Sequence, residues 1–284
     1  MRFVVSIRGA KEQRRYQSTV IIKNMQLFYG FFLAVIIAYI AFRARSLSKD
    51  GAFAAILVGA VVFGLGGLRW AILLLIFFIT SSALSSLFKK HKRGLNEKFS
   101  KGTKRDAGQV LGNGGLATAF VLINSLYPES SIGWVGFAAS LAAVNADTWA
   151  TELGVLNPSP PRMITDLRKR VEKGTSGGVS LFGTLASLLG ASAIAIPAAL
   201  FTDNWLLFPL ITFAGLAGSL FDSFLGATVQ AMYYCPTDNK ETEKHPLHTC
   251  GTQTVHTRGW RWLTNDWVNF ACGAFGLLIA YWLL

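Results

Sequence analysis

Two carboxylates, an amide and two hydroxyls stand close together at the end of a long apolar segment. The stretch reads Asn145-Ala146-Asp147-Thr148-Trp149-Ala150-Thr151-Glu152-Leu153-Gly154. Ionisable groups inside a membrane span are costly, and they are kept mostly where they face a polar cavity and do chemistry or transport. Carboxylate, hydroxyl and amide oxygens suit Mg²⁺, which commonly also binds substrate phosphates. The pattern predicts Asp147 as a magnesium ligand; for Thr148 and Thr151, hydrogen bonding between helices is a credible alternative.

The two carboxylates of this stretch differ in direction on a regular helix. At about 100° per residue, Asn145, Thr148 and Glu152 share one stripe, whereas Asp147 and Thr151 share a second. Asp147 and Glu152 therefore meet around one ion only if the helix unwinds near its end. Otherwise each lines a different wall of one cleft.

A second carboxylate for the metal lies further along the chain, on a face of small and polar residues. The face consists of Gly215, Ser219, Asp222, Ser223, Gly226 and Gln230. Small residues at helical spacing are more often structural, because they let helices pack closely. Asp222 in the middle of the face favours a site, and we expect it to share Mg²⁺ with Asp147.

A glycine-rich segment, Gly174-Thr175-Ser176-Gly177-Gly178, follows a basic run that ends at Lys173. Glycines let backbone N–H groups approach a ligand, and a helix N-terminus favours anions. The Gly-x-x-x-x-Gly-Lys-Ser/Thr order of a Walker loop is absent. We expect a phosphate-binding loop that opens the sixth span, with a tight turn as the alternative. A second, weaker candidate for a phosphate-binding segment is Leu111-Gly112-Asn113-Gly114-Gly115, which contains Asn113.

Oxygen ligands also stand at the mouth of the last span. Asn265, Asp266 and Asn269 are spaced so that they reach the same face, and Asn265 and Asp266 are expected to complete a nucleotide or phosphate pocket. The alternative for Thr264 or Asn265 is a helix cap.

Potential soft-metal ligands gather in the loop that follows the seventh span. Cys235, Asp238, His248 and Cys250 offer Cys-x-x-Asp followed by His-x-Cys, but Cys-x-x-Cys is missing and Asp is an uncommon ligand in structural zinc sites. The sequence therefore favours a polar loop over a zinc site. Three cysteines also argue against a disulfide framework.

The elements that position these residues are membrane spans. Of the 284 residues, 52% are hydrophobic and 15% charged, and the mean hydropathy is +0.41; soluble domains carry about 25% charged residues. We predict an all-α, polytopic bundle of about seven to eight spans, in a single integral membrane domain over residues 25–284. The predicted spans are 25–42, 51–68, 70–88, 113–126, 132–153, 179–201, 206–230 and 267–284, the fourth being short and broken or re-entrant.

The positive charges lie between the apolar segments. Loops after the odd-numbered spans hold 20 of the 27 Lys and Arg residues, whereas Arg69 alone lies in the loops after the even-numbered spans. The net charge of +12 thus indicates loops against anionic lipid rather than a nucleic-acid partner. The odd loops are predicted to be cytoplasmic or stromal. Residues 1–24 are predicted to be a basic arm, either a cytosolic or disordered segment or a targeting leader.

All the polar motifs adjoin odd-numbered loops, so they are predicted to cluster at one membrane face. A one-sided cluster suits an enzyme with a cytosolic or stromal cosubstrate better than a channel, which needs polar lining at both ends. Motifs typical of serine hydrolases, zinc proteases and dinucleotide-binding proteins are absent from the sequence.

Four strings carry a resemblance to a known family. They are residues 145–154, Gly-Thr-Ser-Gly-Gly-Val-Ser (174–180), Gly-Ser-Leu-Phe-Asp-Ser-Phe-Leu-Gly-Ala-Thr (218–228) and Thr-Asn-Asp-Trp-Val-Asn (264–269). In order over roughly residues 45–284, the chain resembles the transmembrane protein 19-like integral membrane family that contains plant and cyanobacterial phytyl-phosphate kinase. That family is expected to have Cys-Pro-x-Cys where this chain has Cys235-Pro236-Thr237-Asp238, which further weakens the zinc interpretation. Residues 147–178 are also similar to the signature of cytidylyltransferases and polyprenol kinases.

The resemblance implies a magnesium-dependent kinase that phosphorylates phytyl phosphate or a related isoprenoid monophosphate with CTP or ATP, for tocopherol or prenyl-lipid synthesis. Asp147 and Asp222 would bind Mg²⁺, with Glu152 a third ligand or the group orienting the acceptor phosphate. The expected host is a bacterial or cyanobacterial inner membrane or a plastid envelope. A transporter or sensor that couples ions through the same carboxylates is the main alternative, and a lipid-binding scaffold is a third.

Overall fold

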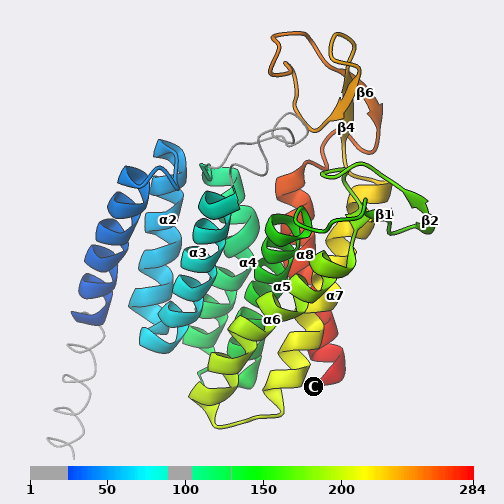
Figure 1. The fold of residues 1–284 in the computed structure, drawn as a ribbon. Helices are drawn as coiled ribbons and strands as arrows, with labels where there is room; N and C mark the ends of the chain where they lie inside the picture. The colour runs from blue at the N-terminus through cyan, green and yellow to red at the C-terminus, as the bar shows by residue number, and fades with distance from the viewer. Residues whose placement is uncertain (1–24, 89–103, 129) are drawn as a thin grey trace, which may run out of the picture.

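A computed structural model describes residues 25–88, 104–128 and 130–284, in which eight long helices lie side by side (Figure 1). The predicted arm 1–24 and most of the basic loop after the third span lie outside the described residues. The helices are Met25–Arg43, α2 (Lys49–Val61) with the π-helical turn η1 (Val62–Gly66), α3 (Leu68–Leu87), α4 (Ala107–Leu126), α5 (Ser131–Gly154), α6 (Leu181–Thr202), α7 (Leu207–Thr228) and α8 (Asn265–Leu283).

Six of the described helices are long and apolar enough to cross a membrane, and they agree with six of the predicted spans. They are Met25–Arg43, Lys49–Gly66, Leu68–Leu87, Leu181–Thr202, Leu207–Thr228 and Asn265–Leu283. Large apolar side chains on their outer faces are exposed, such as Phe53 (72%) and Trp282 (81%), as expected for surfaces that face lipid. The predicted polytopic helical bundle is therefore confirmed.

Helix α5 is the centre of the bundle. It packs against α3, α4, α6, α7 and α8, and residues 133–146 are all buried. Because the neighbouring helices shield it from lipid, α5 tolerates polar residues that would be costly on an outer helix.

A chain of hydrogen bonds ties α5 to α3 and α6. The Trp149 indole donates to the Thr80 hydroxyl at 3.2 Å, and Thr80 and Ser81 donate to Oδ1 of Asn145 at 3.4 and 3.3 Å. The Asn145 amide nitrogen donates to the Gly190 carbonyl at 2.7 Å. Asn145 therefore joins helices, which is the structural role typical of amides in membrane interfaces.

Helix α4 corrects one prediction, because the fourth span is neither short nor broken. It is a continuous helix of 20 residues that begins at Ala107, where Asp106 and Gln109 form a reciprocal capping box. Gly112 serves packing instead of a break: a Cβ added to it would lie 2.7 Å from the Asp266 carbonyl oxygen.

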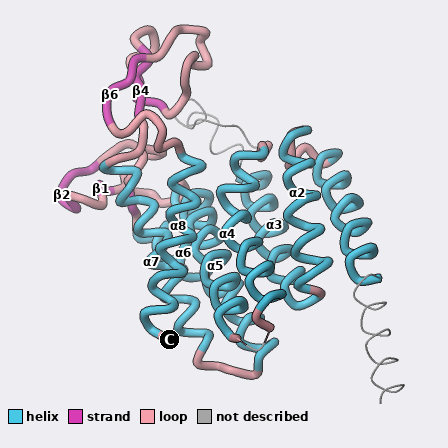
Figure 2. Tube along the Cα trace, turned by 180° about the vertical axis from the view of Figure 1, so that it is seen from behind, coloured by secondary structure: helices cyan, strands magenta, loops and turns pink. Residues whose placement is uncertain are grey.

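Two small antiparallel sheets stand outside the bundle, at the same end of it (Figures 1 and 2). The strands are β1 (Arg162–Met163), β2 (Asp166–Arg170), β3 (Gly178–Val179), β4 (Met232–Cys235), β5 (Lys240–Thr242) and β6 (Val255–Arg258). Their orders are β2-β1-β3 and β5-β4-β6, with Arg162 opposite Arg170 and Val179, and Tyr233 opposite Thr242 and His256. Strands this short lack the alternation that reveals a strand in sequence.

Close packing around α5 makes a stability prediction. A Cβ added to Gly218 of α7 would lie 2.6 Å from the Ala143 Cβ and 2.8 Å from the Cys272 carbonyl oxygen, whereas one added to Gly115 of α4 meets nothing within 4 Å. Gly218→Ala is expected to lower the free energy of unfolding by about 1–3 kcal/mol through overpacking. Gly115→Ala gains the same helix propensity without the clash. Thermal unfolding in detergent compares the two variants, and equal changes of the unfolding temperature would contradict the prediction.

Candidate active site

One cavity of about 280 Å³ gathers polar groups at the end of the bundle where the two sheets lie. Its walls come from the end of α3, the beginning of α4, the ends of α5 and α7 and the beginnings of α6 and α8, together with the loops between them. Within the described residues, its charged lining residues are Arg105, Asp147, Glu152, Lys173, Asp222 and Glu243. Helices that alternate in direction thus bring segments distant in sequence to one place.

The cavity lining includes every predicted site residue except Asp266. These residues are Asn113, Asp147, Glu152, Lys173, Gly174, Thr175, Ser176, Gly177, Gly178, Asp222 and Asn265. Asn265 and Asn269, one turn apart on α8, face the cavity, and Asp266 is rotated away from them. Thr264 is the N-cap residue of α8, but its side chain makes no capping hydrogen bond. The chemical roles of these residues remain predictions.

Asp147 and Asp222 are brought together by the packing of α5 against α7. Both helices end at the cavity, so they run in the same direction. A Cβ on Gly218 would lie 2.6 Å from that of Ala143, and each aspartate follows its contact residue by four positions, about one helical turn. The closest approach of the two helices therefore places the two aspartates at the same level.

The donor set around Asp222 fits a magnesium ion. The Oδ2 atom of Asp222 is buried and has no hydrogen-bond partner within the described residues. The charged neighbours of Asp222 are Asp147 and Glu243. Carboxylates gathered in a buried place repel one another unless a cation joins them, and oxygen donors are the ligands that Mg²⁺ takes.

Glu152 lies with a cation on a different wall. It accepts a hydrogen bond of 2.7 Å from the Ser85 hydroxyl. Burial lowers the pKa of the nearby Arg105, and the negative charge of Glu152 opposes that shift. Helix α5 stays regular to Gly154, so of the two arrangements open from the sequence, the one with the carboxylates on separate walls is observed.

Arg105 is held by several contacts at the edge of the cavity. Its Nη1 donates to the Ser82 hydroxyl at 2.6 Å, and its guanidinium carbon lies 5.8 Å from the centre of the Phe78 ring. The guanidinium is therefore oriented before any ligand binds, which lowers the entropy cost of binding an anion.

The glycine-rich loop, residues 174–178, packs on the end of α7. Gly174 and Gly177 have positive φ angles of 77° and 84°, and the Ser176 hydroxyl donates to Oε1 of Gln230 at 3.0 Å. The loop leads into a helix as predicted, two residues later than expected: the chain first passes through β3, and α6 begins at Leu181 after its N-cap, Ser180. Strand pairing of β3 with β1 fixes this part of the chain before the helix begins.

Several lining residues were missed by the sequence analysis as parts of the site, namely Ser85, Gln109 and Glu243. Ser81, Ser82 and Ser85 belong to a polar stretch at the end of an otherwise apolar span, and this stretch could have indicated the site. Glu243 comes from the loop segment between α7 and α8, where its Oε1 accepts a 2.9 Å hydrogen bond from Nε2 of Gln230. No sequence pattern marks it, because only the folded sheet brings it to the cavity.

The close contact under the glycine-rich loop generates a second prediction. A Cβ on Gly177 would lie 2.5 Å from that of Ala227, whereas one on Gly251, whose φ is also positive, meets nothing within 4 Å. Gly177→Ala is expected to lift the loop from α7 and to lower its local opening free energy by about 1–3 kcal/mol. Hydrogen exchange of residues 172–180 measures this. Gly251→Ala is the control, because it introduces the same strain at a positive φ angle without a steric clash. Equal hydrogen exchange of residues 172–180 in both variants would contradict the role of the contact between Gly177 and Ala227.

Comparisons with known proteins identify the family of the chain. Residues 32–277 match the family described as "Integral membrane protein DUF92". The chain is 34% identical over 272 residues to "Protein PGR" of Arabidopsis thaliana, which covers 87% of this chain and 92% of that protein. It is 32% identical over 207 residues to an uncharacterized membrane protein of Methanocaldococcus jannaschii, covering 72% and 83%.

A further relative in Arabidopsis thaliana is named "Protein VTE6, chloroplastic". It is 27% identical over 244 residues, which cover 82% of this chain and 64% of that protein. No solved structure matches the chain. These findings confirm the family resemblance seen in the sequence: the chain belongs to the DUF92 family of integral membrane proteins.

Proposed function

We propose that this protein is a membrane-embedded kinase that converts an isoprenoid monophosphate of the phytyl type to its diphosphate, with CTP or ATP as the phosphoryl donor. The observation that carries the proposal is one cavity in which carboxylates of α5 and α7 face a glycine-rich loop and two cations. The resemblance of four motifs to the family of phytyl-phosphate kinase supports this reaction, whose product would supply tocopherol or related prenyl-lipid synthesis.

The proposed reaction requires mainly that the negative charges of the phosphates be neutralised. An oxygen of the acceptor phosphate attacks the γ-phosphorus, a P–O–P bond forms, and the bond to the nucleoside diphosphate breaks. Because the second pKa of a phosphate monoester is about 6, the acceptor is already largely a dianion at neutral pH and needs no general base. Such a transfer depends on positioning and on stabilising negative charge.

The cations of the cavity would meet this demand. Lys173 donates to the Val155 carbonyl at 2.9 Å, which directs its ammonium group into the cavity wall beside the glycine-rich loop. We assign Lys173 and residues 174–178 to the nucleotide phosphates. Asn113 and Asn265, across the cavity, would supply amide groups to the phosphates, whereas Asp266, predicted with them, lies outside the lining.

Asp147 and Asp222 would hold Mg²⁺. When bound, the ion supplies charge neutralisation at the nucleotide phosphates. Glu152, which accepts a hydrogen bond from Ser85 and whose negative charge acts on Arg105, is assigned the positioning role: its charge would help to hold Arg105 toward the acceptor phosphate. The fixed guanidinium then neutralises charge on the acceptor side.

A second, apolar cavity of about 70 Å³ gives a place for the first carbons of the lipid tail. It is lined by the helix Met25–Arg43, α2, α3 and α4, with side chains such as Ala38, Val58 and Phe77. Arg105, Gln109 and Asn113 line both cavities. An isoprenoid phosphate bound at this junction would place its first carbons among apolar side chains and its phosphate beside Arg105.

The orientation is also part of the proposal. The described parts of the loops rich in Lys and Arg lie at the same end of the bundle as the polar cavity, which Arg105 and Lys173 line. By the positive-inside rule this end faces the cytoplasm of a bacterial or cyanobacterial cell or the stroma of a plastid. Both compartments contain the nucleoside triphosphate that the reaction needs.

The direct test is transfer of a labelled γ-phosphoryl group. Purified protein in detergent, with Mg²⁺ and γ-labelled CTP or ATP, is offered phytyl phosphate and geranylgeranyl phosphate. We expect labelled diphosphate, and we expect Asp147→Asn and Asp222→Asn each to lower the rate by on the order of 100-fold or more, because each would remove a carboxylate ligand of the Mg²⁺ that neutralises the phosphates.

Asp203→Asn is the matched control, because Asp203 is exposed in the loop between α6 and α7, away from the cavity, and has the left-handed backbone that Asn tolerates. Its rate is expected to equal that of the unchanged protein. Absence of transfer by folded protein with either nucleotide would overturn the kinase proposal in favour of an ion-coupled transporter. In that case Asp147→Asn would abolish transport, and nucleotide would leave thermal stability unchanged.

A further inference from the structure

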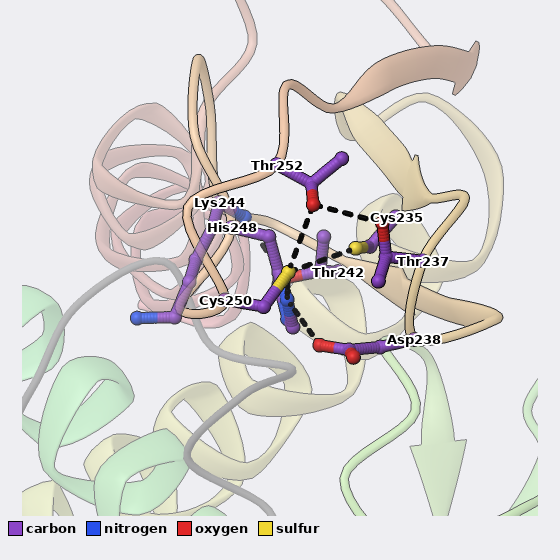
Figure 3. A network of polar contacts seen from close by, with 8 residues as sticks. All are labelled: Cys235, Thr237, Asp238, Thr242, Lys244, His248, Cys250 and Thr252. Carbon is purple, nitrogen blue, oxygen red and sulfur yellow. Dashed lines mark hydrogen bonds and ion pairs between the residues drawn. The ribbon is translucent and has the colours of Figure 1, made fainter.

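The segment between α7 and α8, residues 229–264 and here called the insert, carries its own cluster of metal-binding side chains. Cys235 ends β4, Asp238 lies in the turn that follows, and His248 and Cys250 lie in the loop before β6. Their sulfur, nitrogen and carboxylate ligand atoms all lie within 4.8 Å of one another. Figure 3 shows the four side chains pointing toward a common centre.

The individual distances are close to those of a tetrahedral metal centre. The Sγ atoms of Cys235 and Cys250 are 3.5 Å apart, and Nδ1 of His248 is 3.4 Å from Sγ of Cys250. With Zn–S and Zn–N distances of about 2.3 and 2.0–2.1 Å, tetrahedral ligand atoms lie roughly 3.3–3.8 Å apart. His248 and Asp238 are closer, at 2.8 Å, so these two side chains would separate when they bind a metal ion.

We propose that Cys235, Asp238, His248 and Cys250 bind one Zn²⁺ ion as a structural site. Two thiolates and an imidazole are soft ligands that select zinc over Mg²⁺ or Ca²⁺. Four protein ligands leave no open position for a substrate, as in structural zinc sites. Asp238 made zinc the less favoured interpretation of the sequence. In the fold it occupies the position at which a third cysteine would complete a set of four zinc ligands.

The surroundings of the four ligands support a formed site. The His248 side chain is fully buried, and the turn that follows it is closed by a 2.9 Å hydrogen bond from the Gly251 amide to the His248 carbonyl. Cys235 is buried and Cys250 is exposed, so an ion reaches the site from the Cys250 side. The turn and the loop are also joined by the hydroxyls of Thr237 and Thr252, 2.8 Å apart.

An insert of this size needs a source of stability besides its own apolar core, and a metal site would supply it. Its strands have only four, three and four residues, and a sheet this small cannot bury enough apolar surface to be stable by itself. The insert nevertheless has to hold Gln230 and Glu243 against the wall of the polar cavity. A zinc ion that joins β4 to the loop before β6 would supply the missing stability.

The first experiment measures metal directly. Full-length protein is purified in detergent through a tag without histidine, and zinc per chain is determined by mass spectrometry of the elements. We expect one zinc per chain. Replacement by Co²⁺ is expected to produce absorption from thiolate-to-metal charge transfer, a signature that needs no variant and no assay of activity.

Three variants identify the ligands. Cys250→Ser is expected to abolish zinc binding, whereas Cys272→Ser, the same change at a buried cysteine of α8, is expected to keep it. Asp238→Cys replaces the carboxylate by a thiolate, and zinc release to a chelator is expected to slow by about tenfold. The last variant keeps the test informative if Cys250→Ser does not fold.

Several results would overturn the proposal. One is that folded protein with reduced thiols binds no zinc after zinc is added and shows no charge-transfer absorption after Co²⁺ is added. Equal loss of zinc in Cys250→Ser and Cys272→Ser is another. A disulfide between Cys235 and Cys250 in the folded protein would show that the pair is a redox bridge instead. None of these readouts depends on kinase activity, so the two proposals fail separately.

Discussion

A carboxylate-bearing helix stands at the centre of an apolar bundle, and the rest of the structure depends on this constraint. Residues 133–146 of α5 are buried among the other helices, whereas the last turns carry Asp147 and Glu152. Charge inside a membrane protein is tolerated only where polar partners or a cation compensate for lost solvent. Each neighbouring helix supplies polar groups at that end, and the cavity is the result.

Packing and electrostatics oppose each other at the contact of α5 with α7. Gly215 and Gly218 remove side chains where α7 meets Ala142 and Ala143, so the backbones approach closely. The same approach brings Asp222 near Asp147, at an electrostatic cost that the small-residue packing offsets. A cation between the aspartates would relieve the repulsion. If Mg²⁺ binds there as proposed, its affinity would depend on helix packing, because a wider spacing of α5 and α7 would lower both the repulsion between the aspartates and the affinity for the ion.

The sequence predicted the long helices well because span-length apolar runs carry a strong signal. The one-sided cluster followed from the positions of the polar motifs next to basic loops. The beginning of α4 was misjudged: the glycines around Asn113 suggested a break, although the capping pair Asp106 and Gln109 marked the true helix start. Asp266 was grouped with Asn265 by proximity in sequence, but adjacent helical residues point about 100° apart.

What the sequence did not reveal lies in the loops. The two sheets are built from strands of two to five residues, whose pairing depends on contacts distant in sequence. Glu243 reaches the cavity only through such pairing, as Tyr234 of β4 stands opposite Glu241 of β5. The ligands Asp238 and His248 likewise come together from two separate turns. Periodicity reports burial along one element, and it contains no information on contacts between short irregular segments.

The position of Arg105 finally connects the fold to the kind of substrate. The guanidinium lies at the junction of the polar and the apolar cavity, over the Phe78 ring and within reach of Ser82. A soluble anion would use the polar side alone and leave the apolar cavity without a role. A ligand with an anionic head and an apolar tail uses both sides, and its depth in the membrane is then set by where Arg105 stands. This argument supports a lipid phosphate as the acceptor independently of any likeness to other proteins.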